Sequence, residues 1–417
     1  MNDDYRLLVS IRSATRPVAR LIALVLVALA TPCARVSATV SPESLEVRLV
    51  AQNFNVATNR QLRFVLDVSN EHARNALAND PTARVNVAVG NALTGRSQVL
   101  DIAERGLTFD RVAETSLRIR QLDRTDVGDF VVQSSLIGNL RRLSSGVHPV
   151  TVELLREDAV VGSVTSFINL FSEAESFAPL PVSMIASIDA PNSFTPQGAI
   201  QLSAQTRGQL ETLAGLVELG PAPISVQVAP HVLEALARST EPNDIALRDR
   251  LVAALPRHES LLTTFVPFDP SSASRSSLVD AFTEQLQFGE MAIDKYNGDA
   301  PLDRVVWFSR VPVDRDGVSL TRQLGFQTLV LTPQAALGVG SLDNYAKPYR
   351  VDGSTGGSSM VLRTVDPLHG RLLSTQTGDQ LVTAYTIAAD LLVGRQEIIP
   401  SGGDPATRHA VLATNSG

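Results

Sequence analysis

Apolar and polar residues alternate along the chain from Leu45 to about Phe171. The segments LEVRLVAQNFNV, LRFVLDVSN, ARVNVAVGNAL and DFVVQSSLIG, and the run that begins at His148, carry apolar residues at every second position. This period is typical of strands that bury one face, and Arg156-Glu157-Asp158 is a polar turn between two of them. Only EHARNALAND has a helical pattern. Roughly six to eight strands over about 130 residues predict an antiparallel β-sandwich of immunoglobulin-like type.

The pattern changes after a Glu/Ser/Pro-rich connector, SEAESFAPLPV. Short, continuously apolar runs now alternate with segments whose apolar residues recur every three or four positions. The strand-like runs are VSMIASID, ISVQVAP, LLTTFVPF, VVWFSRVPV and TLVLTP, and the helical segments are AQTRGQLETLAGLVEL, ALRDRLVAAL and SRSSLVDAFTEQLQFGEMAI. Strict alternation of strand and helix predicts a parallel sheet covered by helices.

The number of strands distinguishes a barrel from an open sheet. Five strand-like runs precede Pro333, DGSTGGSSMVLRTVDPL adds a sixth, and RHAVLAT follows the helical DQLVTAYTIAADLLVGRQ as a seventh. Seven strands fit an incomplete β/α barrel, and an open doubly wound sheet is the alternative. The predicted fold class is therefore multidomain: an N-terminal antiparallel β-sandwich followed by an incomplete, seven-stranded β/α barrel.

The first 38 residues have the composition of a secretory signal. Three arginines lead into an apolar run over residues 21–30, and the small residues that a signal peptidase reads end at Ala38. The run is shorter than the roughly 20 residues of a membrane span. We expect cleavage after Ala38 and a secreted or cell-envelope protein; an uncleaved anchor, lengthened by residues 17–19, is the alternative.

This assignment sets the domain boundaries and the chemistry of the mature chain. The domains are a signal peptide (1–38), an immunoglobulin-like sandwich (39–173), a linker (174–181) and a β/α domain (182–417). Cys33 is the only cysteine and leaves with the signal, so the mature chain forms no disulfide. The signal carries five arginines and two aspartates, so its removal takes the formal charge from −7 to −10. Such an acidic protein is not expected to bind nucleic acid.

The order of the segments carries a family resemblance. A signal and a sandwich are followed by a β/α domain that contains VPFDPSS, by a helical segment from Ala384 to Leu392, and by a strand from Arg408 to Thr414. This order resembles a family of large secreted glycoproteins of actinobacteria, whose β/α part is similar to the seven-stranded barrel of polysaccharide deacetylases and some glycoside hydrolases. The 34 arginines against two lysines also indicate a GC-rich bacterial genome. The resemblance implies a cell-envelope protein that handles carbohydrate.

Polar residues at the carboxyl ends of the predicted strands form the candidate site, because ligands bind there in β/α folds. They are Asp189 after the first strand, His231 after the second, Asp269 after the third, and Arg310 and Asp314 in and after the fourth. Glycoside hydrolysis needs two carboxylates about 5 to 10 Å apart, which Asp269 with either other aspartate would supply. His231 and Arg310 are candidate ligand-binding residues, and Trp307 in VVWFSR is a candidate platform for stacking a sugar.

Each candidate also has a structural interpretation. The aspartates stand in turn-like sequences, where aspartate caps helices and proline shapes loops. A tryptophan inside an apolar strand is more often a core residue. The six histidines are scattered, and no pair has the three- or four-residue spacing of a deacetylase metal site, so neither a metal nor a cofactor is expected.

Two functions fit these residues. The first is a secreted, cell-envelope-associated protein without catalytic activity that binds cell-wall polysaccharide or another envelope protein. The alternative is a carbohydrate-active hydrolase, a glycoside hydrolase or deacetylase-like enzyme, that uses Asp189, Asp269 or Asp314. The absence of a complete catalytic motif from the sequence favours the first.

Overall fold

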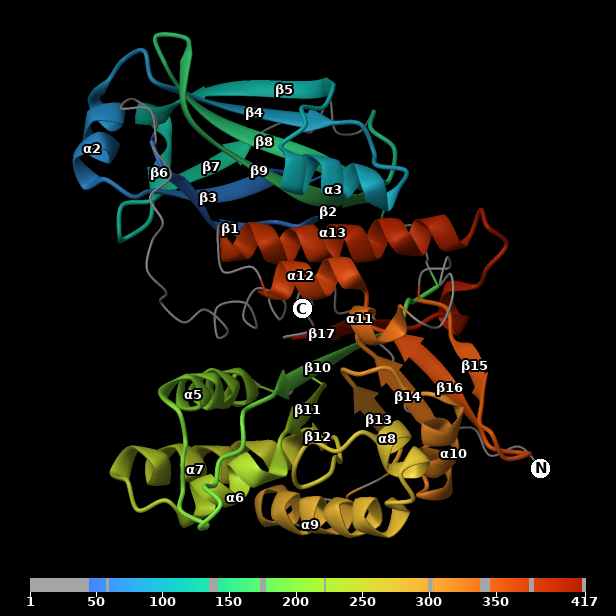
Figure 1. The fold of residues 1–417 in the computed structure, drawn as a ribbon. Helices are drawn as coiled ribbons and strands as arrows, with labels where there is room; N and C mark the ends of the chain where they lie inside the picture. Colours follow the sequence, from blue (N-terminus) through green and yellow to red (C-terminus); the bar gives the residue numbers. More distant parts are fainter. Residues whose placement is uncertain are drawn as a thin grey trace.

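The structure is a computed structural model that describes residues 45–57, 60–134, 142–172, 178–220, 223–298, 302, 304–337, 346–374 and 379–414. The predicted signal peptide, residues 1–38, lies outside this part of the chain, as does the first half of the predicted linker. The described residues form a mixed α/β protein with several sheets (Figure 1). Mostly antiparallel sheets occupy one end, and curled parallel sheets occupy the other.

The alternating N-terminal segments form two sheets. One has the order β1-β3-β7-β6 and the other the order β2-β9-β8-β4-β5, and all neighbours are antiparallel except β2 and β9. The strands are β1 (Val47–Gln52), β2 (Asn55–Ala57), β3 (Leu62–Val68), β4 (Arg84–Gly90), β5 (Arg111–Arg118), β6 (Asp123–Arg124), β7 (Phe130–Ser134), β8 (Gly146–Arg156) and β9 (Ala159–Phe171). The predicted polar turn joins β8 to β9, and φ values of 50° at Glu157 and 65° at Asp158 fit a type I′ hairpin.

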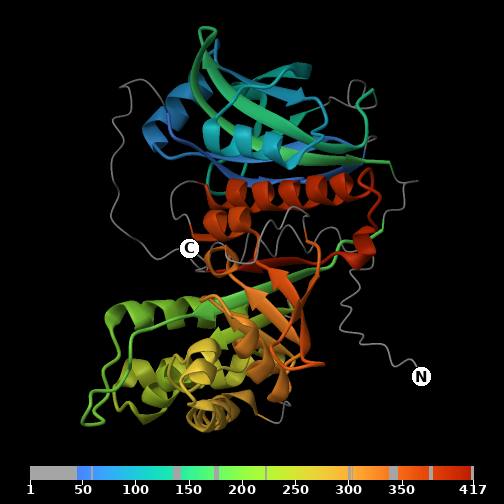
Figure 2. The same cartoon turned by 45° about the vertical axis from the view of Figure 1, so that its right-hand side comes forward.

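The second half of the sequence forms two further sheets. One has the parallel order β12-β11-β10-β17, and the other has the parallel strands β13-β14-β16 with antiparallel β15 at its edge. The strands are β10 (Val182–Ile188), β11 (Ile224–Val228), β12 (Glu259–Ser260), β13 (Val306–Ser309), β14 (Thr328–Leu331), β15 (Tyr349–Asp352), β16 (Ser359–Thr364) and β17 (Ala410–Ala413). A parallel bridge between Val365 and Val411 connects the two sheets. They curl into a half-barrel (Figure 2), in which β12 and β13 belong to different sheets.

Helices cover the sheets and fill the connections. They are α2 (Glu71–Asn79), α3 (Arg96–Arg105), α5 (Ala204–Glu218), α6 (Pro230–Arg238), α7 (Pro242–Ala254), α8 (Pro270–Arg275), α9 (Val279–Asn297), α10 (Arg315–Gln323), α11 (Pro333–Ala336), α12 (Pro367–Ser374) and α13 (Gln380–Ile398), with short 3₁₀ turns at Ile119–Gln121, Leu255–Arg257 and Pro405–Thr407. The sequence analysis did not predict helices α3, α6, α10, α11 and α12. Helix α6 starts with Pro230, a residue that suits the first helical position but resembles a loop signal in a sequence.

Helix α13 joins the two halves of the molecule. It lies between the N-terminal sheets and the half-barrel in Figure 1, and the ring of Tyr385 stacks on Phe54 with centroids 5.3 Å apart. The Tyr385 hydroxyl also donates a hydrogen bond of 3.1 Å to the carbonyl of Gln52. The sequence predicted a separate core for each domain, whereas one continuous cluster of buried apolar residues extends from β3 through α13 to α5 and β11.

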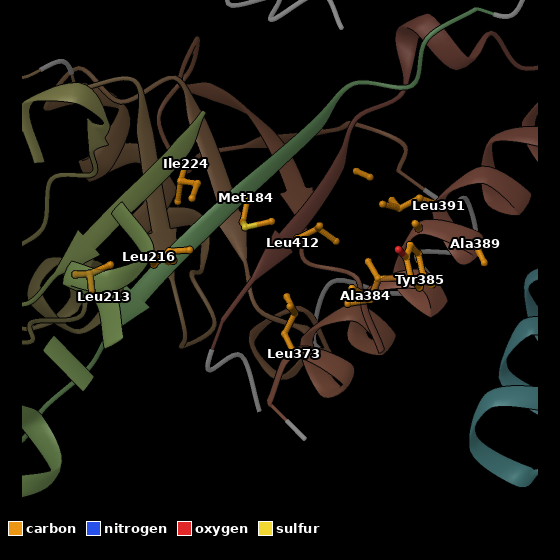
Figure 3. Packing of buried hydrophobic residues seen from close by; sticks show 14 of the residues in the cluster. Met184, Leu213, Leu216, Ile224, Leu373, Ala384, Tyr385, Ala389, Leu391 and Leu412 are labelled. Atoms are coloured by element: carbon orange, nitrogen blue, oxygen red, sulfur yellow. The ribbon is translucent and has the colours of Figure 1, made fainter. Parts of the chain in front are cut away.

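The far side of α13 faces the half-barrel. Figure 3 shows the buried residues of this region, labelled Ala384, Tyr385, Ala389 and Leu391 on α13, Leu373 on α12, Leu412 on β17, Met184 on β10, Ile224 on β11, and Leu213 and Leu216 on α5. Helices thus cover the outer face of β17, β10 and β11. The opposite face of these strands is left to line the inside of the curl.

A smaller apolar cluster fills the inside of the half-barrel. Its buried members are Ile185, Leu261, Phe308, Val330, Val365, Val411 and Ala413, which come from or directly follow six different strands. Side chains two residues apart on a strand share a face, so Ser187 lies on the same face as Ile185, next to its register partner Gln227. The inner face of β10 and β11 is therefore apolar within the half-barrel and polar at the carboxyl ends of the two strands.

Candidate functional site

Asp189 and Arg310 meet at the carboxyl ends of β10 and β13. Nη1 of Arg310 lies 3.0 Å from Oδ2 of Asp189, and Nη2 donates a hydrogen bond of 2.9 Å to the hydroxyl of Ser187. The Arg310 side chain is 26% exposed, whereas that of Asp189 is 56% exposed. Burial lowers the pKa of Arg310, and the Asp189 carboxylate opposes this shift. Two predicted site residues therefore form an asymmetric ion pair.

A chain of hydrogen bonds holds Arg310 from the inside of the half-barrel. The Ser187 hydroxyl that accepts from Arg310 donates to Oε1 of Gln227 at 3.2 Å. Nε2 of Gln227 in turn donates to the backbone carbonyl of Phe308 at 3.4 Å. Because the last acceptor belongs to β13, the strand that leads into Arg310, this relay ties the guanidinium to three strands and fixes its direction.

His231 is fully buried near this pair. It is the second residue of α6, which follows β11, and its Nδ1 accepts hydrogen bonds from the backbone N–H of Ser193 at 3.3 Å and from the Ser193 hydroxyl at 3.1 Å. These bonds leave the proton of the neutral ring on Nε2. Burial lowers the pKa of His231, and the charge of Asp189 acts against that shift. His231 is thus a neutral imidazole within electrostatic reach of Asp189.

Asp269 and Asp314 lie together but serve as helix caps. Asp269 caps α8, where its carboxylate accepts from the backbone N–H groups of Ser271 and Ser272, and Asp314 caps α10 by accepting from Gly317 at 2.9 Å. The Ser271 hydroxyl also accepts from the backbone N–H of Asp314 at 2.9 Å, which places the two helix N-termini side by side. Among the described residues, neither carboxylate bonds to the Asp189–Arg310 pair. These positions are those of the structural interpretation, not of a carboxylate pair around Asp189.

Trp307 is a core residue. It is 4% exposed, and its ring packs on Phe282 and Phe326 with centroid distances of 5.7 and 5.1 Å. Trp307 follows Val306 and precedes Phe308 on β13, and Phe308 points into the half-barrel, so Trp307 points to the opposite face, toward the helices. The ring is therefore covered by protein and does not offer a face for stacking a sugar.

Sequence reasoning missed the polar residues that support the ion pair. Ser187 and Gln227 stand inside runs that were interpreted as continuously apolar strands. A partial signal was present: Ser225 and Gln227 in β11 are two positions apart, and Ser183 and Ser187 in β10 are four apart, so each pair shares one face of its strand. We call Ser187, Asp189, Gln227, His231 and Arg310 the strand-end site.

A second group of charged residues was also missed, and it lies in the interior. Arg96 at the start of α3 lies 2.6 Å from Asp390 of α13 and 2.7 Å from Asp366, and Nε2 of His369 lies 2.8 Å from Asp390. Asp390 and His369 have no exposed side-chain surface. Burial disfavours the ionised form of Asp366, but the charges of His369 and Arg96 outweigh it and hold its pKa below the usual value. This group joins three distant segments of the chain.

Two properties of the described part of the chain bear on the kind of site. No three His, Cys, Asp or Glu side chains in it are grouped so that they could hold a metal ion. Of the helices within it, none combines the length and apolar character that crossing a membrane requires.

Comparison with known proteins assigns no family, because neither a protein-family model nor a curated protein matches the sequence. An FMN-binding β-glucuronidase from Facaelibacterium prausnitzii L2-6 is 8% identical, with a TM-score of 0.21 over 88% of this chain and 54% of that one. A β-glucuronidase from Ruminococcus gnavus is 10% identical, with a TM-score of 0.18 over 70% and 46%. A glycosyl hydrolase family 2 member from Bacteroides cellulosilyticus is 10% identical, with a TM-score of 0.17 over 70% and 40%.

This chain therefore spans about half the length of these solved proteins or less. The TM-scores are too low to establish a common fold. The functional conclusion below rests on the geometry of the strand-end site.

Proposed function

We propose that this chain is a carbohydrate-active protein that holds a glycan at the strand-end site. The observation that carries the proposal is the Asp189–Arg310 ion pair at the carboxyl ends of β10 and β13, where β/α folds bind their ligands. The pair is partly open to solvent, and the relay through Ser187 and Gln227 orients the guanidinium before any ligand arrives. Such preorganisation reduces the cost of ordering the site on binding.

The chemistry of the pair suits sugar hydroxyls. A hydroxyl both donates and accepts hydrogen bonds, and the pair offers a carboxylate that only accepts beside a guanidinium that only donates. Polar groups of one sugar would reach the pair from its solvent-exposed side.

Hydrolysis is the second candidate function, and the exposure of Asp189 beside the neutral His231 favours it. Glycosidic cleavage by the usual route needs two carboxylates, and the helix caps Asp269 and Asp314 are engaged elsewhere. Removal of an acetyl ester needs only one base and one cation. Asp189 would take a proton from the water molecule that attacks the acetyl carbonyl, and Arg310 would stabilise the oxyanion of the tetrahedral intermediate. When the ester C–O bond breaks, the sugar oxygen would leave with the proton from Asp189, and acetic acid would be released.

Incubation of the full chain with cell-wall polysaccharides, with binding measured first and released sugar or acetate measured afterwards, tests both functions. We expect Arg310→Gln to abolish binding, and Asp189→Asn to abolish any product. Asp269→Asn keeps an oxygen at the helix cap and is the matched control for a carboxylate outside the site. Binding that survives Arg310→Gln would contradict the proposed site, and product that survives Asp189→Asn would contradict the proposed base.

Export to the cell envelope is part of the same proposal and rests on the sequence. A basic segment followed by the apolar run over 21–30 and small residues up to Ala38 is the pattern of a cleaved signal. Expression with the complete N-terminus in a bacterial host, followed by N-terminal sequencing, should give a mature protein that starts at Thr39. Retention of residues 1–38 on a membrane-bound product would instead indicate the uncleaved anchor.

A further inference from the structure

The two partners of the Asp189–Arg310 ion pair are held very differently. Arg310 is about one-quarter exposed and is fixed from the inside by the Ser187 hydroxyl. Asp189 is more than half exposed, and Arg310 is the one hydrogen-bonding or ion-pairing partner of its carboxylate among the described residues. The guanidinium is therefore part of the framework, while the carboxylate is attached to it from the solvent side.

The ion pair stabilises Arg310 much more than it stabilises Asp189. Burial disfavours the charged form of Arg310, so the guanidinium requires an anion next to it. Asp189 gains little in return, because an exposed carboxylate is well solvated without a partner. Any other carboxylate that reaches Arg310 would satisfy the cation equally well, and Asp189 would turn into water at small cost.

The shape of the position favours a carboxylate over other anions. The Asp189 group that now occupies it is planar, has two oxygens and carries one negative charge. The present contact is single: Nη1 faces one oxygen of Asp189 while Nη2 donates to Ser187. A ligand carboxylate would therefore take over the Nη1 contact with a guanidinium whose direction is already fixed. A dianionic group would bring a second charge to a chain whose formal net charge is already −7.

We propose that Asp189 occupies the place of a ligand carboxylate, and that the strand-end site recognises an acidic glycan whose uronic acid displaces Asp189 from Arg310. This inference rests on the proposed function, since it names the class of sugar that the same site takes. In the free protein Asp189 competes with the ligand for Arg310. The apparent affinity is therefore reduced by the fraction of molecules in which the internal pair is closed.

The inference predicts that Asp189→Asn increases the affinity for an acidic ligand, although the substitution removes a residue of the strand-end site. Loss of the competing carboxylate leaves Arg310 without its anion, so an acidic oligosaccharide should bind about tenfold more tightly if the pair is closed about nine-tenths of the time. An Asp189 that accepted hydrogen bonds from a neutral sugar would give the opposite result, weaker binding after the same substitution. Arg310→Gln should abolish binding of the acidic ligand.

Isothermal titration of the full chain with oligogalacturonate and with its methyl ester tests this directly. The ester has the same sugars and linkages but no charge, so it isolates the contribution of the carboxylate. We expect the acid to bind and the ester to bind at least tenfold more weakly, with Asp189→Asn strengthening only the acid. Asp314→Asn, which disrupts the exposed Arg275–Asp314 pair, is the control for loss of a charge elsewhere.

Different results would contradict the inference and the proposed function. Equal binding of acid and ester, both weakened by Asp189→Asn, would overturn the acidic-ligand inference and leave the carbohydrate function standing. No binding of acid, ester or neutral cell-wall oligosaccharides would contradict both. Ser187→Ala, which keeps both charges but removes the inner hydrogen bond, should weaken acid binding and provides a second variant if Arg310→Gln does not fold.

Discussion

His409 is a residue whose surroundings make the stability of the protein depend on pH. Burial first, and then the charge of Arg363, lower its pKa from 6.5 to about 4. Its Nε2 lies 2.6 Å from the hydroxyl of Ser183. Since the folded pKa is below the unfolded one, the unfolded chain takes up this proton first. The free energy of unfolding should therefore be highest above pH 6.5 and fall as the pH drops toward 4.

Urea unfolding at several pH values between 4 and 7 measures this effect. His409→Gln keeps a polar group near Ser183 but removes the ionisation, so the stability difference between variant and wild type should change in favour of the variant as the pH falls. Other groups titrate in this range in both proteins and cancel in the difference. A difference that stays constant with pH would contradict the assigned environment of His409.

Asp269 should behave as a helix cap and not as a site residue. Its carboxylate accepts from two backbone N–H groups at the start of α8, so Asp269→Ala should lower the free energy of unfolding by about 1 kcal/mol. Asp269→Asn keeps a capping oxygen and should cost much less. Chemical denaturation measures both, and glycan affinity should be unchanged in each. A loss of glycan affinity without a loss of stability would show that Asp269 belongs to the ligand-binding site and would contradict its role as a helix cap only.

Sequence reasoning at the residue scale could place charges but not their partners. Asp189 and Arg310 were predicted at strand ends, and parallel strands bring such ends to one edge. The roles of Asp269 and Asp314 were left open because a capping sequence and a catalytic one look alike. Whether Trp307 is a core residue or a stacking platform depends on which face of β13 carries it. The sequence of a four-residue strand does not reveal this.

Helix α9 lies so close to the chain after β12 that one of its positions must be glycine. A Cβ atom at Gly289 would lie 2.1 Å from the carbonyl oxygen of Thr263. We expect Gly289→Ala to lower the free energy of unfolding by about 1 to 3 kcal/mol, because the helix or the backbone at Thr263 must move.

Gly215 in α5 is the matched control for this prediction. A Cβ atom there meets nothing within 4 Å, so Gly215→Ala should be neutral or stabilise by up to about 1 kcal/mol through helix propensity. Thermal and urea unfolding of the two variants gives the comparison. Equal effects of the two substitutions would show that α9 does not approach Thr263 so closely.

The predicted elements were mostly found, and the exceptions have physical causes. The apolar run LLTTFVPF was predicted as the third strand, but only Glu259–Ser260 pairs with β11, and the run itself has no regular structure. An apolar run indicates that its residues are buried, and residues of an irregular segment beneath α9 can be buried as well as those of a strand. The Gly/Ser-rich segment SLDNYAKPYRVDGSTGGSS is compatible with a long loop or a hairpin by its composition, and the antiparallel pairing of β15 with β16 shows the hairpin.

At the scale of the whole molecule, Arg96 holds the N-terminal sheets to the C-terminal helices. Its guanidinium contacts Asp366 and the fully buried Asp390. Arg96→Met leaves a buried carboxylate without its cation and should lower the free energy of unfolding by roughly 3 kcal/mol or more. Arg350→Met breaks the exposed pair with Asp352 and should cost less than about 1 kcal/mol.

Urea unfolding followed by circular dichroism compares these two variants. If Arg96→Met lowers the free energy of unfolding no more than Arg350→Met does, the ion pairs of Arg96 with Asp366 and Asp390 do not hold the two halves together. If instead Arg96→Met unfolds in two steps while the wild type unfolds in one, the two halves have separated, as the assigned role requires.

The packing of the N-terminal sheets and the half-barrel against α13 could not be predicted from the sequence. Helix α13 was predicted from its apolar pattern, and the continuation of that pattern around the helix is explained by burial against both halves. Which elements would cover it could not be predicted, because Phe54 and Asp390 are more than 300 residues apart and nothing local links them. The sequence therefore divided the chain after residue 173, while contacts through α13 join the two parts.

The affinity of the full chain for soluble cell-wall oligosaccharides, measured for wild type, Arg310→Gln and Arg275→Gln, tests the central claim most directly. Both variants lose one arginine that pairs with an aspartate, but only Arg310 belongs to the strand-end site. We expect Arg275→Gln to bind like the wild type and Arg310→Gln to lose at least about tenfold in affinity. Equal affinity of all three proteins would place carbohydrate binding elsewhere and contradict the strand-end site.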